Sequence, residues 1–247
     1  MSNLDLLKKL IKIESISPND NGCFDVIKQQ FEGLDFSFEE TSYKNISNLV
    51  ITNGNSKNKT FCFLGHTDVV PPGPESEWTV PPFSGEIIDN KIYGRGAADM
   101  KGGVACFISA LKEFLSEYKD PSFNIMVLLN SNEEGKLENG KVDRVINEMI
   151  DKDKFIDFCL IGEPSSSKKV GDVIRIGRRG SLSGNLKVYG IQGHVAYPKQ
   201  ALNPILGMGK TLEELKNMEW DRGNENFEPT SFQVSNIKSG TGAENVV

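Results

Sequence analysis

Acidic and imidazole side chains follow several apolar segments of this chain, where they could act together in catalysis or metal binding. His66 and Asp68 follow TFCFLG, Glu133 and Glu134 follow FNIMVLL, and Glu163 follows FCLIG. A folded protein does not gather this many carboxylates in one place without a cation that neutralises them. The simplest neutraliser is a pair of divalent metal ions, so the pattern predicts part of a metallohydrolase.

The spacing of His66 and Asp68 favours a metal ligand with its supporting group. In an extended segment, residues two apart point the same way. An imidazole nitrogen can bind Zn²⁺ while the nearby carboxylate orients the ring. A histidine satisfied by a local turn is the alternative. The chain has only 2 histidines, and the position of this one favours the ligand interpretation.

Asp99 stands before Met-Lys-Gly-Gly, at the expected start of a helix. Aspartate is a preferred N-cap residue, worth about 1 kcal/mol in that role. A role between two metal ions is not visible from the local residues. The residues alone leave both interpretations open.

Glu133 and Glu134 are adjacent carboxylates that point in opposite directions if the chain is extended. One of them can bind metal while the other faces a bound water whose pKa the metal lowers toward about 7. A carboxylate in that place can act as a general base. The alternative is a solvated acidic turn, because Gly135 and Asn139-Gly140 follow.

The periodicity of apolar residues predicts helices and strands that alternate along the first part of the chain. Helices are expected at residues 3–13, 22–33, 100–118 and 141–150, and strands at 48–52, 60–64, 123–129 and 158–161. This order predicts an α/β domain with a mostly parallel sheet. Ligands gather beyond the carboxyl ends of such strands. A single carboxylate in a loop is usually no more than a solvated surface group. Here the acidic and imidazole groups follow three different strands at the same edge of the predicted sheet, which favours a shared site.

The pattern changes near residue 178, which predicts a second, smaller α+β unit. Residues 181–190 alternate as a half-exposed strand would, a helix is expected at 203–218, and a strand at 231–237. The predicted domains are therefore 1–178 and 179–247.

The composition is that of a globular protein, with 247 residues and a net charge of −6. The acidic balance argues against nucleic acid as a partner. No signal peptide or membrane span is apparent, and Cys62, Cys106 and Cys159 lie in apolar runs as expected of reduced core thiols, so we expect a cytoplasmic protein. The ending Glu-Asn-Val-Val resembles the start of a strand, and we expect a truncated chain.

Several stretches together resemble the di-zinc aminoacylase/carboxypeptidase (M20) family. They are LGHTDVVPPG, EWTVPPFSGEIIDNKIYGRGAADMKGG, EEG, IGEPSS, GRRGSL and IQGHVAYP. The resemblance covers essentially the whole chain and keeps the order of the motifs. It implies a zinc-peptidase-like catalytic domain, residues 1–178, followed by an incomplete lid or dimerisation domain.

The resemblance also implies a role for each matching residue. His66 and Glu163 would hold one Zn²⁺, Asp99 would bridge two Zn²⁺ ions, Glu134 would hold the second, Glu133 would be the general base, and Asp68 would orient His66. Co²⁺ or Mn²⁺ could occupy the same ligands. The peptide bond after Asp99 would be cis.

Three further residues would act on the substrate of a homodimer. His194 would stabilise the oxyanion in the neighbouring subunit's site, Arg178 would bind a substrate carboxylate, and Asn245 would contact the substrate. A guanidinium suits a carboxylate, although Arg178 could equally be a solvated surface charge.

Within the family, these stretches most resemble enzymes of lysine biosynthesis that hydrolyse N-succinyl-LL-2,6-diaminopimelate to succinate and LL-2,6-diaminopimelate. An N-acetylornithine deacetylase or a peptidase is the alternative within the family.

The chain departs from the family pattern at one metal ligand. The second zinc of the family takes a histidine near the C-terminus, whereas no histidine follows His194. Lys199 and Asn132 stand where many relatives have histidine and aspartate. An inert fragment or a one-zinc binding module is therefore a further alternative.

Overall fold

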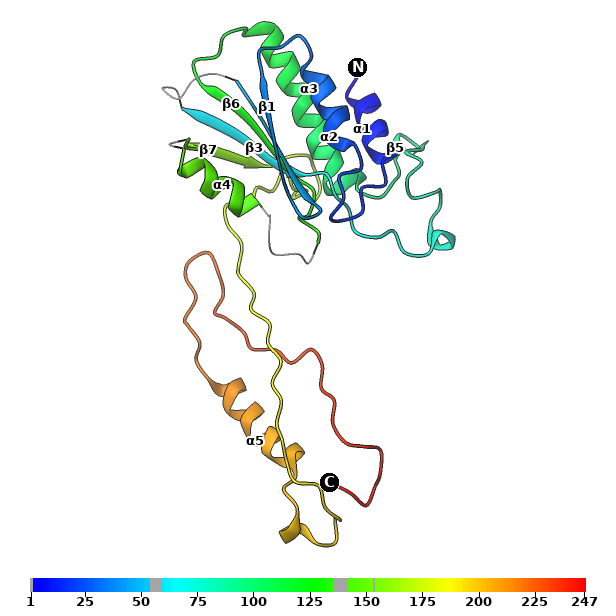
Figure 1. Cartoon of the computed structure of the whole chain (residues 1–247), viewed down its shortest axis with the longest axis vertical. Helices are drawn as coiled ribbons and strands as arrows, with labels where there is room; N and C mark the ends of the chain where they lie inside the picture. The colour runs from blue at the N-terminus through cyan, green and yellow to red at the C-terminus, as the bar shows by residue number, and fades with distance from the viewer. Residues whose placement is uncertain (1, 54–58, 136–141, 153) are drawn as a thin grey trace. The chain divides into compact units, whose positions relative to one another are not determined.

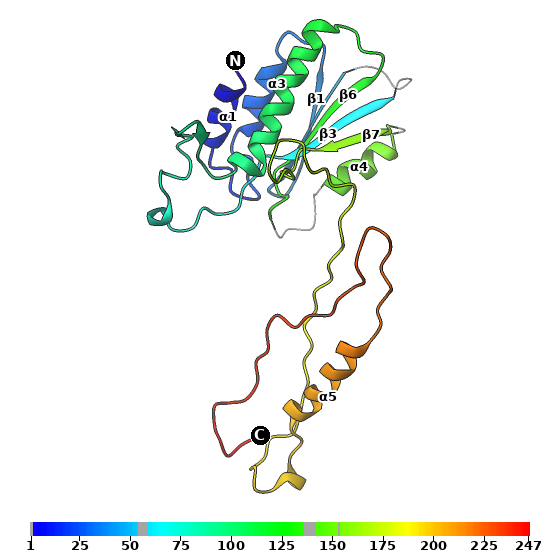
Figure 2. The same cartoon turned by 180° about the vertical axis from the view of Figure 1, so that it is seen from behind.

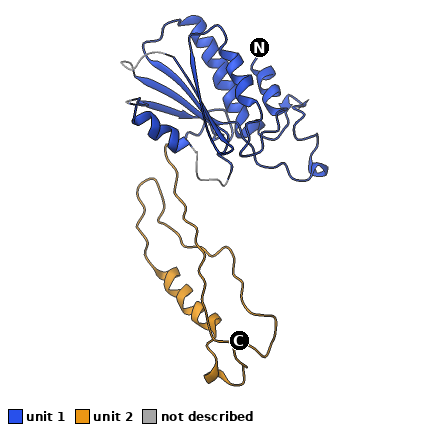
Figure 3. Cartoon of the chain, in the orientation of Figure 1, with its two compact units in different colours: residues 1–174 blue, residues 175–247 orange. Residues whose placement is uncertain are grey.

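The computed structural model describes residues 2–53, 59–135, 142–152 and 154–247. It divides into two compact units, which we call unit 1 (Met1–Ile174) and unit 2 (Arg175–Val247) (Figure 3). Unit 1 carries the predicted metal ligands, and unit 2 carries the three residues expected to act on the substrate.

A mixed sheet forms the middle of unit 1. Its strands are β1 (Ser37–Tyr43), β2 (Ile46–Thr52), β3 (Thr60–His66), β6 (Asn124–Asn130) and β7 (Phe158–Ile161), in the order β1-β2-β6-β3-β7. The β3–β6 and β3–β7 pairs are parallel, whereas β1–β2 and β2–β6 are antiparallel. The prediction of an α/β sheet is confirmed, but the prediction that it is mostly parallel is wrong.

The antiparallel half of the sheet arises from a hairpin that the sequence pattern does not reveal. Tyr43 pairs with Ile46 across the tight connection at Lys44, whose φ is +55°. Such a connection joins antiparallel strands, whereas parallel strands need a longer crossover. The strand β1 is polar and largely exposed, so it lacks the apolar alternation that predicts a strand.

Helices cover both faces of the sheet (Figures 1 and 2). The helices α1 (Asn3–Ile11), α2 (Cys23–Lys28) and α3 (Gly102–Glu117) share the larger core cluster, and α4 (Val142–Ile150) forms a smaller one on residues of β2, β3 and β6. Every residue of β6 is buried. All four predicted helices are present, although residue 141, the expected first residue of α4, lies outside the described residues.

Short elements complete the fold. They are η1 (Gln29–Phe31), η2 (Glu75–Glu77), β4 (Ile87–Ile88), β5 (Lys91–Ile92), η3 (Ala97–Lys101) and η4 (Pro198–Gln200). The pair β4–β5 forms a separate antiparallel hairpin. Within the described residues, none of the helices combines the length and apolar character needed to cross a membrane.

Unit 2 contains the helix α5 (Pro204–Asn217), which the sequence pattern predicts. The carboxamide of Asn203 accepts a hydrogen bond from the Ile205 amide at 2.9 Å and caps the helix. The prediction of strands at 181–190 and 231–237 is wrong, because the backbone of these residues does not pair with another segment as a strand would. Their alternating pattern suits a strand, but a strand also needs a neighbour that pairs with its backbone groups.

The prediction that Cys62, Cys106 and Cys159 are all core thiols is partly wrong. Cys62 is buried, whereas Cys106 and Cys159 are exposed. An apolar run does not distinguish a central strand from an edge strand, and Cys159 lies on β7 at the edge of the sheet.

The buried side chain of Lys101 joins the end of α1 to the start of α3. Its ammonium group donates hydrogen bonds to the carbonyls of Leu10 and Ile13, both at 2.8 Å. These carbonyls lie at the end of α1 and just after it, where they also accept hydrogen bonds from the backbone amides of Ile13 (to Leu10, 3.2 Å) and Ser15 (to Ile13, 2.9 Å). Burial lowers the pKa of Lys101 from its ordinary value.

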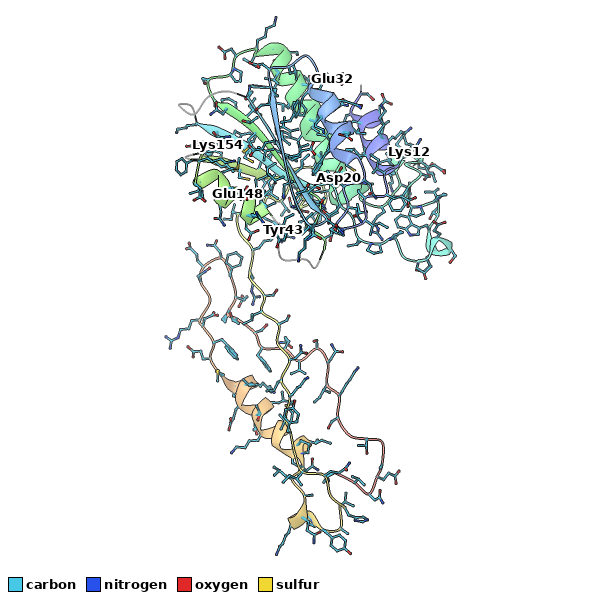
Figure 4. The ribbon with its side chains drawn as sticks, viewed as in Figure 1. Lys12, Asp20, Glu32, Tyr43, Glu148 and Lys154 are labelled. Atoms are coloured by element: carbon cyan, nitrogen blue, oxygen red, sulfur yellow. The ribbon has the colours of Figure 1, made fainter. Side chains whose placement is uncertain are left out.

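We expect Lys101→Met to lower the free energy of unfolding by about 1–3 kcal/mol, because the carbonyls of Leu10 and Ile13 each lose a charged hydrogen-bond donor. Chemical denaturation measures the change. Lys12→Met is the matched control, since Lys12 is an exposed lysine near the same helix end (Figure 4). The control should change stability by less than about 0.5 kcal/mol. Equal effects of the two variants would contradict the role of Lys101.

Candidate metal centre

His66 is the final residue of β3 and is 1% exposed. Its Nδ1 atom lies 2.9 Å from the backbone carbonyl oxygen of Asp68 and 3.5 Å from the Asp68 carboxylate. Its Nε2 atom faces carboxylates, with Asp99 Oδ1 at 3.1 Å and Glu163 Oε1 at 3.6 Å. One ring nitrogen is therefore held locally, and the other faces acidic groups from two distant segments.

The carboxylate of Asp68 connects the end of β3 to the segment after β6. Its Oδ1 accepts a hydrogen bond from the Glu133 amide at 3.0 Å, and its Oδ2 accepts one from the Glu134 amide at 3.1 Å. The hydroxyl of Ser17 also donates to Asp68. Because Asp68 is fully buried, these contacts fix the backbone that carries both glutamates.

Asp99 does not cap α3. The N-cap residue of α3 is Lys101, and Asp99 lies within η3 with non-helical dihedral angles. The Asp99–Met100 peptide bond is cis, as the resemblance implies. The carboxylate of Asp99 instead lies beside His66, so the capping interpretation is wrong for this residue.

The described residues contain two groups whose ligand atoms lie close enough to share a metal ion. One group is His66, Asp99 and Glu163, the other is His66, Glu133 and Glu134, and in each the atoms lie within 4.8 Å of one another. All five residues stand at or beyond the ends of β3, β6 and β7, or at η3 before α3. The convergence expected from strand order is thus present in the structure.

The charges of this cluster disturb the titration of its members. Burial opposes protonation of His66, but the hydrogen bond and charge of Asp68 outweigh burial and raise the pKa of His66 to about 9. Burial also opposes ionisation of Asp68, yet its hydrogen bonds with His66 and Ser17 lower its pKa. Burial and neighbouring carboxylates raise the pKa of Glu134 and of Glu163.

The donor set fits a divalent metal. One imidazole nitrogen and several carboxylate oxygens are typical ligands of zinc, and a bound cation would relieve the repulsion that raises the pKa of Glu134 and Glu163. Metal binding requires a neutral imidazole, so a metal must displace any proton on the inward-facing nitrogen of His66.

Gly103 allows the start of α3 to approach the backbone before Glu163. A Cβ atom at Gly103 would lie 2.3 Å from the carbonyl oxygen of Gly162, which is too close for any side chain. We expect Gly103→Ala to displace the Glu163 segment, to lower the stability of unit 1 by about 1–3 kcal/mol and to weaken zinc binding. Denaturation and zinc titration measure these effects.

Gly209→Ala in α5 provides the control for Gly103→Ala. A Cβ atom at Gly209 would meet nothing within 4 Å, and alanine is the better helix former by about 1 kcal/mol. If Gly103→Ala bound zinc with the same affinity as Gly209→Ala and the unsubstituted protein, the close contact at Gly103 would not be needed to position Glu163.

The structure brings together two of the three functional residues predicted in unit 2. His194 forms an isolated antiparallel bridge with Val246, and the Val195 amide donates to the Asn245 carbonyl at 3.1 Å. His194 and Asn245 therefore lie on neighbouring backbone segments, and both are exposed. Arg178 is exposed as well, and none of the described contacts joins it to this pair.

Sequence reasoning missed Ser17 and Lys101. Ser17 contacts the Asp68 carboxylate from a segment 51 residues away, and Lys101 is fully buried one residue after Met100. A serine in a polar loop and a lysine at a helix start give no local sign of such contacts.

The sequence is similar to those of known metallohydrolases and related enzymes. A family profile described as Peptidase family M20/M25/M40 matches residues 62–242. A succinyl-diaminopimelate desuccinylase of Psychromonas ingrahamii is 50% identical over 244 residues, which is 99% of this chain and 64% of the relative. A succinyl-diaminopimelate desuccinylase of Methylococcus capsulatus is 49% identical over 244 residues, which again cover 99% of this chain and 64% of the relative. The chain thus spans 64% of the length of these relatives.

Solved structures share the fold at low identity. The M20 family metallo-carboxypeptidase Sso-CP2 of Sulfolobus solfataricus has a TM-score of 0.62 at 22% identity, and the match covers 88% of this chain and 50% of that protein. The aminopeptidase PepT of Bacillus cereus has a TM-score of 0.65 at 18% identity, covering 99% and 62%. The profile match extends over most of the described residues and includes the cluster around His66. This chain belongs to the M20/M25/M40 family of peptidases.

Proposed function

We propose that the protein to which this chain belongs hydrolyses N-succinyl-LL-2,6-diaminopimelate to succinate and LL-2,6-diaminopimelate, a reaction of lysine biosynthesis in the cytoplasm. The observation that carries the proposal is the 50% identity with a succinyl-diaminopimelate desuccinylase across 99% of the chain. The cluster of His66, Asp99, Glu133, Glu134 and Glu163 supports it, because metal ligands of this kind beside a carboxylate that can accept a proton suit amide hydrolysis.

The proposed site contains two Zn²⁺ ions, with Co²⁺ as a possible substitute. His66 and Glu163 would hold one ion, Glu134 would hold the other, and Asp99 would be a ligand shared by both. When bound, the ions lower the pKa of a coordinated water and polarise the substrate carbonyl. Asp68 keeps the His66 ring in place and fixes the backbone of the two glutamates through its hydrogen bonds.

Glu133 is the proposed general base. It takes a proton from the attacking water and delivers that proton to the departing amine, so one carboxylate serves both steps. Its Oε2 atom lies 4.0 Å from His66 Nε2, and half of its side chain is exposed, so it borders the metal ligands and remains open to solvent.

Unit 2 is the proposed lid or dimerisation domain of a homodimer. His194 of each subunit stabilises the negative charge that develops on the substrate oxygen in the other subunit's site. Arg178 binds a substrate carboxylate, and Asn245 contacts the substrate beside His194. The pairing of the His194 and Asn245 segments supports a shared role for these two residues.

A substrate panel tests the proposal in a protein that contains this chain. We expect kcat/KM for N-succinyl-LL-2,6-diaminopimelate to exceed that for N-acetylornithine and for dipeptides by more than about a hundredfold, a difference that a few polar contacts can supply. Faster cleavage of N-acetylornithine or of a dipeptide would assign a different member of the family.

A one-zinc binding module is the second candidate. It is favoured by the ligands themselves, because His66 is the one imidazole in the two clustered groups of the described residues. Zinc stoichiometry of the 247-residue chain separates the candidates, since two tightly bound ions per chain would exclude the one-zinc module.

A further inference from the structure

The loop between α1 and α2 pairs with the segment that follows β3. In this loop, which we call the serine loop (residues 15–20), Ile16 forms a parallel bridge with Val69. The amide of Val69 donates to the carbonyl of Ser15 at 2.9 Å, and the amide of Ser17 donates to the carbonyl of Val69 at 3.1 Å. These backbone contacts hold the serine loop beside the segment that carries the predicted zinc-binding histidine and its supporting aspartate.

Three side chains of the serine loop contact the two residues that follow β3. The hydroxyl of Ser15 donates to the Thr67 carbonyl at 2.6 Å. The hydroxyl of Ser17 donates to the Asp68 carboxylate. The carboxylate of Asp20 (Figure 4) accepts a hydrogen bond from the Thr67 hydroxyl at 3.0 Å. Because Thr67 and Asp68 are both 0% exposed, the serine loop supplies polar contacts that solvent cannot supply there.

The serine loop also contacts the segment after β6, which carries the two adjacent glutamates of the cluster. The Pro18 carbonyl accepts a hydrogen bond from the Ser131 hydroxyl at 2.7 Å. The same hydroxyl accepts a hydrogen bond from the Ser47 amide at 2.9 Å. One loop thus contacts both segments whose relative position sets the distance between the histidine and these glutamates.

Ser17 differs from the other residues of the serine loop because its hydroxyl reaches a carboxylate that itself orders the cluster. Besides the Ser17 hydroxyl, Oδ2 of Asp68 accepts a hydrogen bond from the Glu134 amide. The other oxygen, Oδ1, accepts one from the Glu133 amide and lies 3.5 Å from Nδ1 of His66. Hydrogen bonds to an ionised acceptor are stronger than those between neutral groups. Without the hydroxyl, the carboxylate can therefore rotate more easily away from the two amides and the ring.

We propose that Ser17 is a positioning residue of the metal centre. Its hydroxyl holds the Asp68 carboxylate, and through it the two glutamate amides and the histidine ring, in place for zinc. The side-chain contacts described for Ser17 are with Asp68 and Val69, so it acts through Asp68. The inference rests on the proposed function, because it takes the cluster to be a zinc site.

Competitive zinc titration of the 247-residue chain tests the proposal. We expect Ser17→Ala to weaken zinc binding by about 10-fold, the lower end of what loss of a group behind the metal ligands costs. Ser17→Thr keeps a hydroxyl on the same carbon and should bind zinc more tightly than Ser17→Ala. A zinc affinity of Ser17→Ala equal to that of the unsubstituted chain would overturn the proposal.

Ser15→Ala is the matched control. Ser15 belongs to the same loop and also donates to the segment after β3, but its acceptor is a backbone carbonyl, that of Thr67. Because Ser15 is fully buried, its replacement should lower the midpoint of chemical denaturation at least as much as Ser17→Ala. It should leave zinc affinity unchanged. Equal weakening of zinc binding by the two variants would show a general effect of the loop on stability, and Ser17 would have no positioning role.

Hydrogen exchange of the metal-free chain gives a readout that depends on neither zinc nor substrate. The amides of Glu133 and Glu134 donate to Asp68, so their exchange should be faster in Ser17→Ala than in Ser15→Ala. If these two amides exchanged at the same rate in both variants, the hydroxyl of Ser17 would not hold the carboxylate.

Kinetics separates the role of Ser17 from the assignment of the substrate. In a protein that contains this chain, at saturating zinc, Ser17→Ala should lower kcat for N-succinyl-LL-2,6-diaminopimelate by about 10-fold and leave KM unchanged, because Ser17 acts on the metal centre. If another N-acyl substrate is preferred, the proposed function fails, while the zinc affinities and exchange rates of the variants still decide the role of Ser17. Unchanged kcat together with unchanged zinc affinity in Ser17→Ala would overturn that role for any substrate.

Discussion

Glu133→Gln is expected to lower kcat for N-succinyl-LL-2,6-diaminopimelate by about 100-fold to 10,000-fold while zinc content stays the same. A positioned general base contributes a rate factor of this size, and glutamine keeps the shape of the side chain without its capacity to accept a proton. Steady-state kinetics and metal analysis of the same preparation, in a protein that contains this chain and turns over the substrate, measure the two effects together.

Glu32→Gln is the control for this prediction. Glu32 is an exposed carboxylate on the surface of unit 1, outside the cluster (Figure 4). It should retain full activity. Near-normal turnover in Glu133→Gln would show that Glu133 is not the general base. Loss of zinc in this variant would show that Glu133 is a metal ligand, as its position in the group with His66 and Glu134 also allows.

Asp68→Asn is expected to lower the free energy of unfolding of unit 1 by about 3 kcal/mol. It is also expected to weaken zinc binding by about 10-fold to 100-fold. The carboxylate of Asp68 accepts hydrogen bonds on both oxygens, from the amides of Glu133 and Glu134. A carboxamide offers a donor at one of these positions, so one buried amide would lose its acceptor and His66 would lose a neighbouring negative charge. Denaturation and competitive zinc titration measure the two effects.

Asp157→Asn is the matched control for Asp68→Asn. Asp157 also accepts a hydrogen bond from a backbone amide of β3, that of Thr60 at 2.8 Å, but at the opposite end of the strand from His66. Because Asp157 is exposed, its replacement should cost little stability, and it should leave zinc affinity unchanged. If the two variants weakened zinc binding equally, the effect of Asp68 would be a general consequence of disturbing β3.

The convergence of the site could be predicted because strand ends are visible in the sequence. Apolar runs that end at His66, before Glu133 and before Glu163 predict β3, β6 and β7, and the parallel part of the sheet brings these ends to one edge. Asp99 could not be assigned in this way. Its place beside His66 depends on η3 and on how α3 packs against β3, and local residues favour a helix cap equally well.

The antiparallel half of the sheet and the structure of unit 2 could not be predicted, for a different reason. β1 is largely exposed and has no regular alternation of apolar residues, so the sequence pattern does not reveal its pairing with β2 across the hairpin. Residues 181–190 have such a pattern but no pairing neighbour in the described part of unit 2. Periodicity predicts which face a segment would bury, whereas pairing depends on other segments.

Anomalous scattering from crystals of the zinc-loaded protein tests the central claim most directly. We predict a zinc ion about 2.0–2.2 Å from ligand atoms of His66, Asp99 and Glu163, with a second ion between Asp99 and Glu134. Zinc bound at the cysteines or at His194, with no ion beside His66, would contradict the assignment of these residues as a metal centre.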